Sequence, residues 1–206
     1  TNTGGAGITI VSASSTISSV NNTGTVKGGA AIGDNGSKNT GGDSFSAMYN
    51  GATNAMVTYS GTWQGGDAIG EANSTNTGGY GFTVSNTGAG TGTITNNSTM
   101  TGGNATGDTG STNTGGYGIF LQGSNITFTN NAAKIITGGD TSGGTSATGG
   151  DGIYRTGDNH KVVSNGIVNP GTASGASNNP KSFGYRALGT ANTFSHSSAD
   201  DGKAHL

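Results

Sequence analysis

The sequence predicts an all-β, single-domain parallel β-solenoid (β-helix) of about five to six coils, each of about 37 residues with a polar loop. Three observations predict this fold. The chain repeats itself with a period near 37 residues, each repeat holds short runs of alternating apolar and polar residues, and no repeat offers a long apolar pattern at helical spacing.

The repeat is marked by the tripeptide Thr-Gly-Gly, whose successive copies are spaced by 37, 37, 37 and 34 residues: Thr3, Thr40, Thr77, Thr114 and Thr148. A second glycine pair keeps the same rhythm: Gly28, Gly65, Gly102 and Gly138. Two markers that stay in phase are not expected from composition bias. We therefore expect repetitive coils over 1–169, with repeats starting near 3, 40, 77, 114 and 148. Residues 170–206 are expected to form an irregular last coil, a C-terminal cap or an interface segment.

Each repeat contains short strand-like runs. The copy that begins at Thr114 holds three of them, 119–121, 126–128 and 134–136, separated by Gly, Asn or Ser. One repeat is then one coil with three strands and a polar loop, and glycine allows corners with positive φ. The loops, near 30–39, 67–76, 104–113 and 140–147, should all leave from the same edge.

Residues one repeat apart should stack, so the repeat also predicts which side chains point inward. A first apolar column consists of Ile8, Phe45, Phe82, Ile119 and Ile153. A second consists of Val26, Trp63, Met100, Ile136 and Val168, and a third of Ile10, Ala47, Val84 and Leu121. At one corner, the asparagines before each Thr-Gly-Gly should form a ladder: Asn2, Asn39, Asn76 and Asn113.

Composition excludes several classes of protein. Hydrophobic residues are only 29%, charged residues 9%, and the formal net charge is −2, which gives no electrostatic footprint for nucleic acid or anionic lipid. No run approaches the 18 or so apolar residues of a membrane span, so we expect no membrane insertion. Cysteine is absent, which removes disulfides and thiolate metal sites. Because the chain begins with Thr1, we expect a secreted, N-terminally processed product or an excised segment.

The phrase Asn22-Thr23-Gly24-Thr25-Val26, together with the Thr-Gly-Gly-x-Gly units, resembles repeats of bacterial surface proteins. The chain looks like the right-handed parallel β-helix passengers of autotransporters and related surface adhesins. That resemblance implies a secreted or surface-displayed rod, commonly adhesive or structural. Calcium-binding RTX nonapeptides begin like Gly149-Gly150-Asp151-Gly152, but the Asp they require two residues later is Tyr154 here, so that family is rejected.

Candidate chemistry is sparse. The chain holds ten acidic residues, mostly in loops or after glycine pairs, and no cluster typical of carbohydrate-active β-helix enzymes, so we expect no enzyme. Four aspartates directly follow a glycine pair and should bond to backbone in turns: Asp43, Asp67, Asp140 and Asp151. Asp34, Glu71 and Asp108 lie at equivalent positions of three repeats and are weak candidates for a Ca²⁺ site, with solvated turn acids as the alternative. No other cofactor is expected.

One outward column changes character along the chain. Where early repeats have small polar residues such as Thr9, later repeats have aromatic residues next to arginine: Phe120, Tyr154 with Arg155, and Tyr185 with Arg186. Exposed aromatic residues beside arginine predict a contact surface. Three occupants stay open: the chain's own segment 170–206, another subunit, or a glycan.

These observations favour a non-catalytic extracellular or cell-surface protein, structural or adhesive, that stacks end to end as a fibre subunit or forms part of a longer adhesin. Host proteins or glycans are possible ligands. A carbohydrate-active or glycan-binding β-helix protein is the alternative. An ice-binding solenoid is the third, although the Thr9 and Thr83 column is interrupted by Ser46 and ends at Phe120.

Overall fold

The computed structural model describes residues 1–12, 19–49 and 55–196. Every ladder between its strands is parallel, and the described part of the chain contains no helix. The strands stack into four sheets that wind as a β-solenoid of about four turns. The predicted fold class is therefore confirmed, while the expected count of five to six coils was slightly too high.

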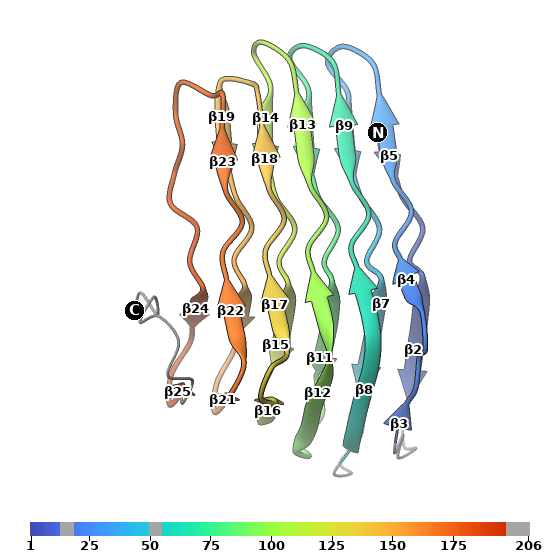
Figure 1. Ribbon diagram of the computed structural model, residues 1–206, viewed down its shortest axis with the longest axis vertical. Helices are drawn as coiled ribbons and strands as arrows, with labels where there is room; N and C mark the ends of the chain where they lie inside the picture. The colour runs from blue at the N-terminus through green and yellow to red at the C-terminus, as the bar shows by residue number, and fades with distance from the viewer. Residues whose placement is uncertain (13–18, 50–54, 197–206) are drawn as a thin grey trace.

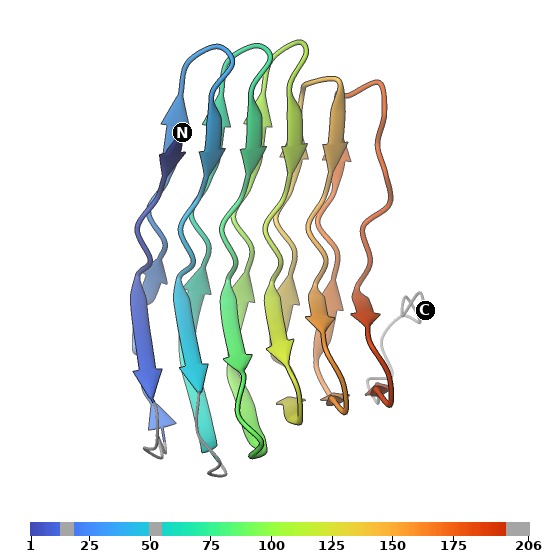
Figure 2. The same ribbon diagram turned by 180° about the vertical axis from the view of Figure 1, so that it is seen from behind.

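The four sheets lie in two layers (Figures 1 and 2). One layer holds sheet A, formed by β1 (Asn2–Thr3), β6 (Lys38–Thr40), β10 (Thr75–Thr77), β14 (Thr112–Thr114) and β19 (Ser146–Thr148). It also holds sheet B, formed by β2 (Ile8–Ser12), β7 (Phe45–Tyr49), β11 (Phe82–Asn86), β15 (Ile119–Gly123), β20 (Ile153–Thr156) and β24 (Tyr185–Leu188).

The second layer holds sheets C and D. Sheet C is formed by β3 (Ser19–Val20), β4 (Thr25–Lys27), β8 (Ala55–Gln64), β12 (Gly92–Thr101), β16 (Ile126–Asn130), β17 (Ile135–Thr137), β21 (Lys161–Ser164), β22 (Ile167–Asn169) and β25 (Thr193–His196). Sheet D is formed by β5 (Ala31–Gly33), β9 (Ala68–Gly70), β13 (Ala105–Gly107), β18 (Thr141–Ser142) and β23 (Ala173–Ser174). Each turn thus crosses four sheets rather than forming three strands. The stretches predicted as loops contain the strands of sheets D and A joined by tight turns.

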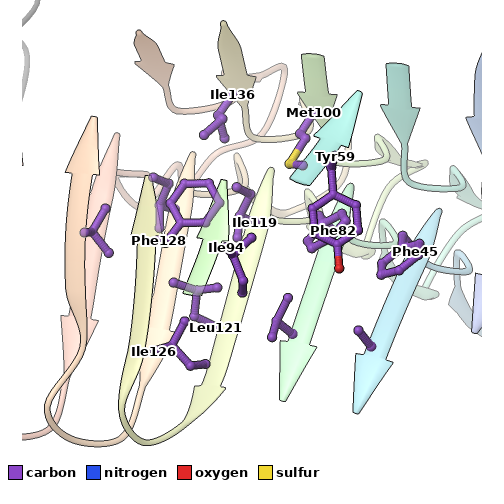
Figure 3. Packing of buried hydrophobic residues seen from close by; sticks show 14 of the residues in the cluster. Phe45, Tyr59, Phe82, Ile94, Met100, Ile119, Leu121, Ile126, Phe128 and Ile136 are labelled. Atoms are coloured by element: carbon purple, nitrogen blue, oxygen red, sulfur yellow. The ribbon is translucent and has the colours of Figure 1, made fainter. Parts of the chain in front are cut away.

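An apolar compartment lies between sheets B and C. The register places the three predicted columns inward: Ile8 pairs with Phe45, Val26 with Trp63 and Val84 with Leu121. Aromatic rings fill the middle turns, where Phe45 and Phe82 stack with centroids 4.7 Å apart. Figure 3 shows these rings and the aliphatic side chains beyond them. Trp63 is fully buried, as predicted, and its indole N–H donates to the Ser60 carbonyl at 3.0 Å.

A second, narrow compartment between sheets A and D is polar. The predicted asparagine ladder is present: Asn2 Nδ2 donates to Asn39 Oδ1 at 2.8 Å, and Asn39 Nδ2 donates to Asn76 Oδ1 at 2.9 Å. Asn76 continues to Asn113 at 2.8 Å. Glycines of sheet D make room for these amides, because a Cβ on Gly70 would lie 2.4 Å from Asn76 Oδ1. Each buried amide is satisfied by the next turn, so a polar interior is tolerated.

The two compartments are separated by a seam of glycines. Ten glycines along the chain are linked in series: Gly5, Gly29, Gly42, Gly66, Gly79, Gly103, Gly116, Gly139, Gly150 and Gly171. Each one after Gly5 donates its backbone N–H to the carbonyl of the one before it, which lies in the opposite layer, and every such bond measures 2.7–2.9 Å. We call this set the glycine seam. The layers approach so closely here that a Cβ on Gly41, the first glycine of the same pair as Gly42, would lie 1.9 Å from the carbonyl oxygen of Gly66 in the opposite layer.

The glycine seam corrects an expectation. Thr-Gly-Gly was expected at a corner that needs positive φ, but the glycines with positive φ lie elsewhere, for example Gly36, Gly110 and Gly123. The paired glycines are required because two backbones meet there, and no side chain of any size fits between them. Asparagine and threonine before each pair belong to sheet A, with the asparagine inward.

Candidate functional site

The outer face of sheet B carries the most unusual surface of the described chain. Phe120 of β15 pairs with Tyr154 of β20, and both point outward as predicted. Tyr80 and Tyr117 lie beside them, just before β11 and β15. We call Tyr80, Tyr117, Phe120 and Tyr154 the aromatic strip. Tyr80 and Tyr117 were missed by the sequence reasoning, although the unit Thr-Gly-Gly-Tyr-Gly repeats after 37 residues and could have revealed them.

The rings of the aromatic strip pack mainly on one another. Tyr80 and Tyr117 stack with centroids 5.0 Å apart and planes 9° apart, and Phe120 and Tyr154 stack at 5.6 Å and 10°. Tyr117 also meets Tyr154 at 4.6 Å. The faces of Tyr117 and Tyr154 are thus occupied by neighbours, which disfavours a sugar ring stacking on them. Burial raises the pKa of Tyr80 to about 12, so its hydroxyl stays protonated.

Arg186 closes the aromatic strip at its C-terminal end. Its guanidinium lies over the Tyr154 ring at 4.7 Å from the centroid, and Arg186 Nε is 2.6 Å from Asp151 Oδ2. Asp151 is almost fully buried, and its other oxygen accepts the backbone N–H of Phe183 at 2.9 Å. Burial raises the pKa of Asp151, while the Phe183 and Arg186 contacts oppose that shift. Arg186 therefore neutralises a buried carboxylate and covers an aromatic face at once.

The prediction that Tyr185 and Arg155 belong to the outward contact surface was wrong, because both side chains are buried. Tyr185 pairs with Ile153 and is buried, and Arg186 rather than Tyr185 lies beside Tyr154. The Tyr-Arg pair occurs in two different registers. Gly184 is equivalent to Gly152, but Tyr185 follows Gly184 directly, whereas Ile153 stands between Gly152 and Tyr154. Arg155 continues the inward column of Leu121 and is only 2% exposed.

Arg155 lies inside the solenoid near its C-terminal end. One terminal nitrogen, Nη1, donates to the His160 carbonyl at 3.0 Å and to the Thr193 carbonyl at 3.3 Å, and the guanidinium lies 4.8 Å from the Tyr185 ring centroid. His160 is buried beside it, and its Nδ1 accepts the Ile126 N–H at 3.3 Å. Burial lowers the pKa of His160, and the charge of Arg155 lowers it further. The geometry fits a neutral imidazole that holds two turns together.

The three candidate calcium ligands lie at the tight turns between sheets D and A. Asp34, Glu71 and Asp108 take equivalent places in successive turns and are all exposed. Across residues 1–12, 19–49 and 55–196, no three His, Asp or Glu side chains come close enough to hold a metal ion. Asp108 borders an open groove of about 700 Å³, formed where the later turns shorten, with Gly143, Gly144 and Thr145 opposite.

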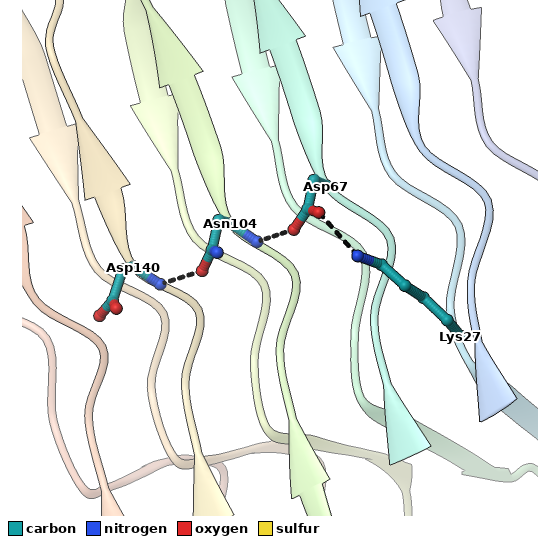
Figure 4. Close-up of polar contacts among 4 residues, drawn as sticks. All are labelled: Lys27, Asp67, Asn104 and Asp140. Carbon is teal, nitrogen blue, oxygen red and sulfur yellow. Dashed lines mark hydrogen bonds and ion pairs between the residues drawn. The ribbon is translucent and has the colours of Figure 1, made fainter. Parts of the chain in front are cut away.

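The aspartates that follow glycine pairs accept hydrogen bonds from backbone N–H groups, as predicted, and all four share one arrangement. Asp67 Oδ1 accepts the backbone N–H of Asn104 at 2.9 Å, and Asn104 Oδ1 accepts that of Asp140 at 2.9 Å (Figure 4). Lys27 ends this row with a 2.9 Å contact to Asp67. Asp43 does the same on the other layer, where Tyr80 donates at 2.9 Å. Each side chain satisfies an N–H one turn further along.

Comparisons of the chain with protein-family models, with curated proteins and with solved structures found no match. In the described part of the chain, no helix has the length and apolar character needed to cross a membrane. The site is therefore interpreted from its own geometry.

Proposed function

We propose that this chain is a non-catalytic structural or adhesive rod, secreted or displayed at the cell surface. The observation that carries the proposal is the continuity of its ladders: the four sheets, the asparagine ladder and the glycine seam all run along the same axis. A cross-section that repeats turn after turn can be continued by further turns, so several copies stacked along this axis would make a stiff, elongated object.

The buried ionisable groups support a structural role. Asp151 is held by Arg186 and by the Phe183 N–H, Arg155 by two carbonyls, and His160 by the Ile126 N–H. All of these contacts except the bond from Arg155 to the His160 carbonyl join one turn to another. Their perturbed pKa values thus have a structural cause, and ion-pair networks of this kind perturb pKa values without catalysis.

We further propose that rods associate end to end. Core side chains of the outer turns are only partly buried: Ile8, Ile10, Val20 and Val26 at one end, Val168 and Phe194 at the other. Among the residues that the structure describes, the outermost strands also have a partner on one side only, except that Ser146 of β19 bridges to Asn178. Open strand edges over an apolar core favour pairing with another β-solenoid turn. Beyond Asn178, Pro180 and Lys181 break the sheet A pattern, which leaves sheets B, C and D for this contact.

The test is negative-stain electron microscopy of the purified chain across a concentration series. We expect thin rods of constant width that lengthen with concentration, and a variant with Ile10→Lys that stays short because a charge is placed in the end contact. Short rods of one length at every concentration, with the variant indistinguishable, would contradict end-to-end association. Labelling of intact producing cells with an antibody against the rod tests surface display: labelling only after lysis contradicts it.

A second candidate function has one specific observation in its favour. The outer side of sheet A presents a threonine column that runs through all five strands of the sheet: Thr3, Thr40, Thr77, Thr114 and Thr148. Thr75 and Thr112 form a second, shorter column beside it. Flat outward threonine rows are what an ice-binding solenoid uses. Measurement of thermal hysteresis tests this directly: activity that Thr77→Lys abolishes supports it, and its absence in the parent chain rejects it.

A further inference from the structure

We propose that the outer face of sheet B is a self-association surface that takes the same face of a second copy of this chain, turned so that the two rods run in opposite directions. This lateral contact is separate from the end-to-end contact proposed above, because it uses the side of the rod. Its product is a closed pair, whereas end contacts give an open series.

The apolar character of this face extends beyond the aromatic strip. Met48 of β7 and Leu188 of β24 point outward and are 40% and 55% exposed. Val11 of β2, in the same outward column as Met48, is 62% exposed. Sheet B therefore carries an aromatic centre with an exposed aliphatic side chain towards each end. Exposed apolar side chains gathered around an aromatic centre on one face are typical of a protein contact.

The order of the strands makes the face self-complementary. In sheet B, β7 and β24 are each the second neighbour of β15, on opposite sides. Met48 and Leu188 occupy the same column, because the register runs through Ser85, Gln122 and Thr156. A two-fold axis along β15 exchanges β7 and β24. It places Met48 against the partner's Leu188. Tyr117 and Phe120 lie on the axis, so they face the same two residues of the partner.

Charge favours the reversed arrangement as an addition to the apolar contact. Asp43 lies at the β7 end of the face and Arg186 at the β24 end. In the reversed pair, the Asp43 end of one rod meets the Arg186 end of the other, whereas in a pair with both rods running the same way β7 lies against the partner's β7 and the two Asp43 ends meet. Both groups already have partners within the chain, since Asp43 accepts from Tyr80 and Thr83 and Arg186 contacts Asp151. The charges therefore add to the preference for one orientation, and the apolar register sets the contact.

The ring geometry also fits a protein partner. Because the faces of Tyr117 and Tyr154 are already covered, the aromatic strip offers mainly ring edges and hydroxyls to a partner. Edge-on contacts between aromatic rings are favourable, and tyrosine hydroxyls can keep hydrogen bonds at the rim. A second aromatic strip supplies both kinds of group.

The first experiment measures the assembly state by sedimentation velocity across a concentration series. With Ile10→Lys as the parent chain, so that end contacts are removed, we expect a monomer–dimer equilibrium that Phe120→Lys shifts to monomer by at least tenfold in dissociation constant. Thr112→Lys is the matched control, because it adds the same charge on the outer face of sheet A, where Lys38 already occupies the column. Far-ultraviolet circular dichroism checks that both variants keep the parent fold. A parent chain that stays monomeric, or a dimer that Phe120→Lys leaves intact, overturns the proposal.

The second experiment tests orientation, and the absence of cysteine makes it clean. Met48→Cys and Leu188→Cys proteins are prepared separately, then treated with a short bismaleimide alone and after mixing. The reversed pair gives cross-linked dimer only in the mixture. Cross-linking within either single preparation indicates rods running the same way and overturns the reversed arrangement. Ile69→Cys, exposed on sheet D, is the control for random collision. Both experiments use chains that also carry Ile10→Lys, because head-to-tail stacking would itself bring Leu188 of β24 into one column with the partner's Met48, with only the partner's β2 between them. A cross-link or a dimer that persists in this background does not come from end contacts.

Discussion

The backbone N–H of Gly66 donates a 2.8 Å hydrogen bond to the carbonyl of Gly42, which lies in the opposite layer of the solenoid. A link of this kind joins every successive glycine pair of the described repeats, so at the glycine seam the two layers are connected by backbone hydrogen bonds without any side chain. Such contact needs both partners to lack a side chain. The 43 glycines of this chain thus include one set that serves packing rather than turning.

Replacement of a seam glycine in a middle turn should be severely destabilising. A Cβ on Gly79 would lie 2.1 Å from the carbonyl oxygen of Gly42, which lies one turn back in the same layer, so Gly79→Ala must force these two turns apart. We expect a loss of about 3 kcal/mol in the free energy of unfolding, measured by urea titration. Gly5→Ala is the control at the same motif position, because nothing lies within 4 Å of its Cβ. Equal losses for the two variants would show that the seam is not the cause.

A substitution in the middle of the asparagine ladder should lower the free energy of unfolding more than a substitution at its end. Asn76 accepts from Asn39 and donates to Asn113 and to Ser74, so Asn76→Ala leaves buried partners unsatisfied, at a cost of about 2 kcal/mol or more. Alanine fits the column, since Ala147 occupies it in β19. Asn2→Ala removes only the bond to Asn39 and should cost less than 1 kcal/mol, as expected for an exposed site. Thermal unfolding that ranks the variants in the opposite order would refute this assignment.

The pair of Arg186 and Asp151 should show coupling in a double-mutant cycle. Arg186→Met leaves the Asp151 carboxylate buried without its cation, and we expect a loss of about 2 kcal/mol, discounted because the arginine side chain is 39% exposed. Asp151→Asn in the same chain should restore part of that loss, because the amide oxygen still accepts the Phe183 N–H. Strictly additive effects of the two substitutions, measured by denaturant titration at pH 7, would show that the ion pair contributes nothing.

Stability should fall as the pH drops below about 6.5. Burial and Arg155 lower the pKa of His160, so the folded chain binds the proton less readily than the unfolded chain, whose histidine titrates near 6.5. The stabilisation is fully present above that pH and is lost as the pH falls towards the lowered pKa. Melting temperatures between pH 8 and 5 measure it. His160→Gln should flatten the profile and His196→Gln should not, and a profile unchanged by His160→Gln excludes this cause.

The repeat made the fold predictable. Residues such as Phe45, Trp63 and Leu121 are one period apart from other apolar residues, and parallel stacking follows from that alone. The place of the glycine pairs was not predictable in the same way. A pair of glycines is compatible with a tight turn or with close backbone contact, and only the meeting of the two layers decides between them.

The candidate site was predictable only in part. Phe120 and Tyr154 were found because they share an outward column, whereas Arg155 and Tyr185 were misplaced because the same two letters occur in two registers. Shortening of the last repeat moves Tyr185 inward. The only local signal for that shift is the position of Gly184 directly before Tyr185, and the Tyr-Arg pair conceals it.

The glycine seam also bears on how such a chain can change over generations. Each link touches only the glycine pair before it and the pair after it, and it involves no side chain. In-frame duplication or loss of one repeat in the coding sequence therefore adds or removes two links and leaves the geometry of the others as it was. The length of the rod can vary while its width is inherited unchanged.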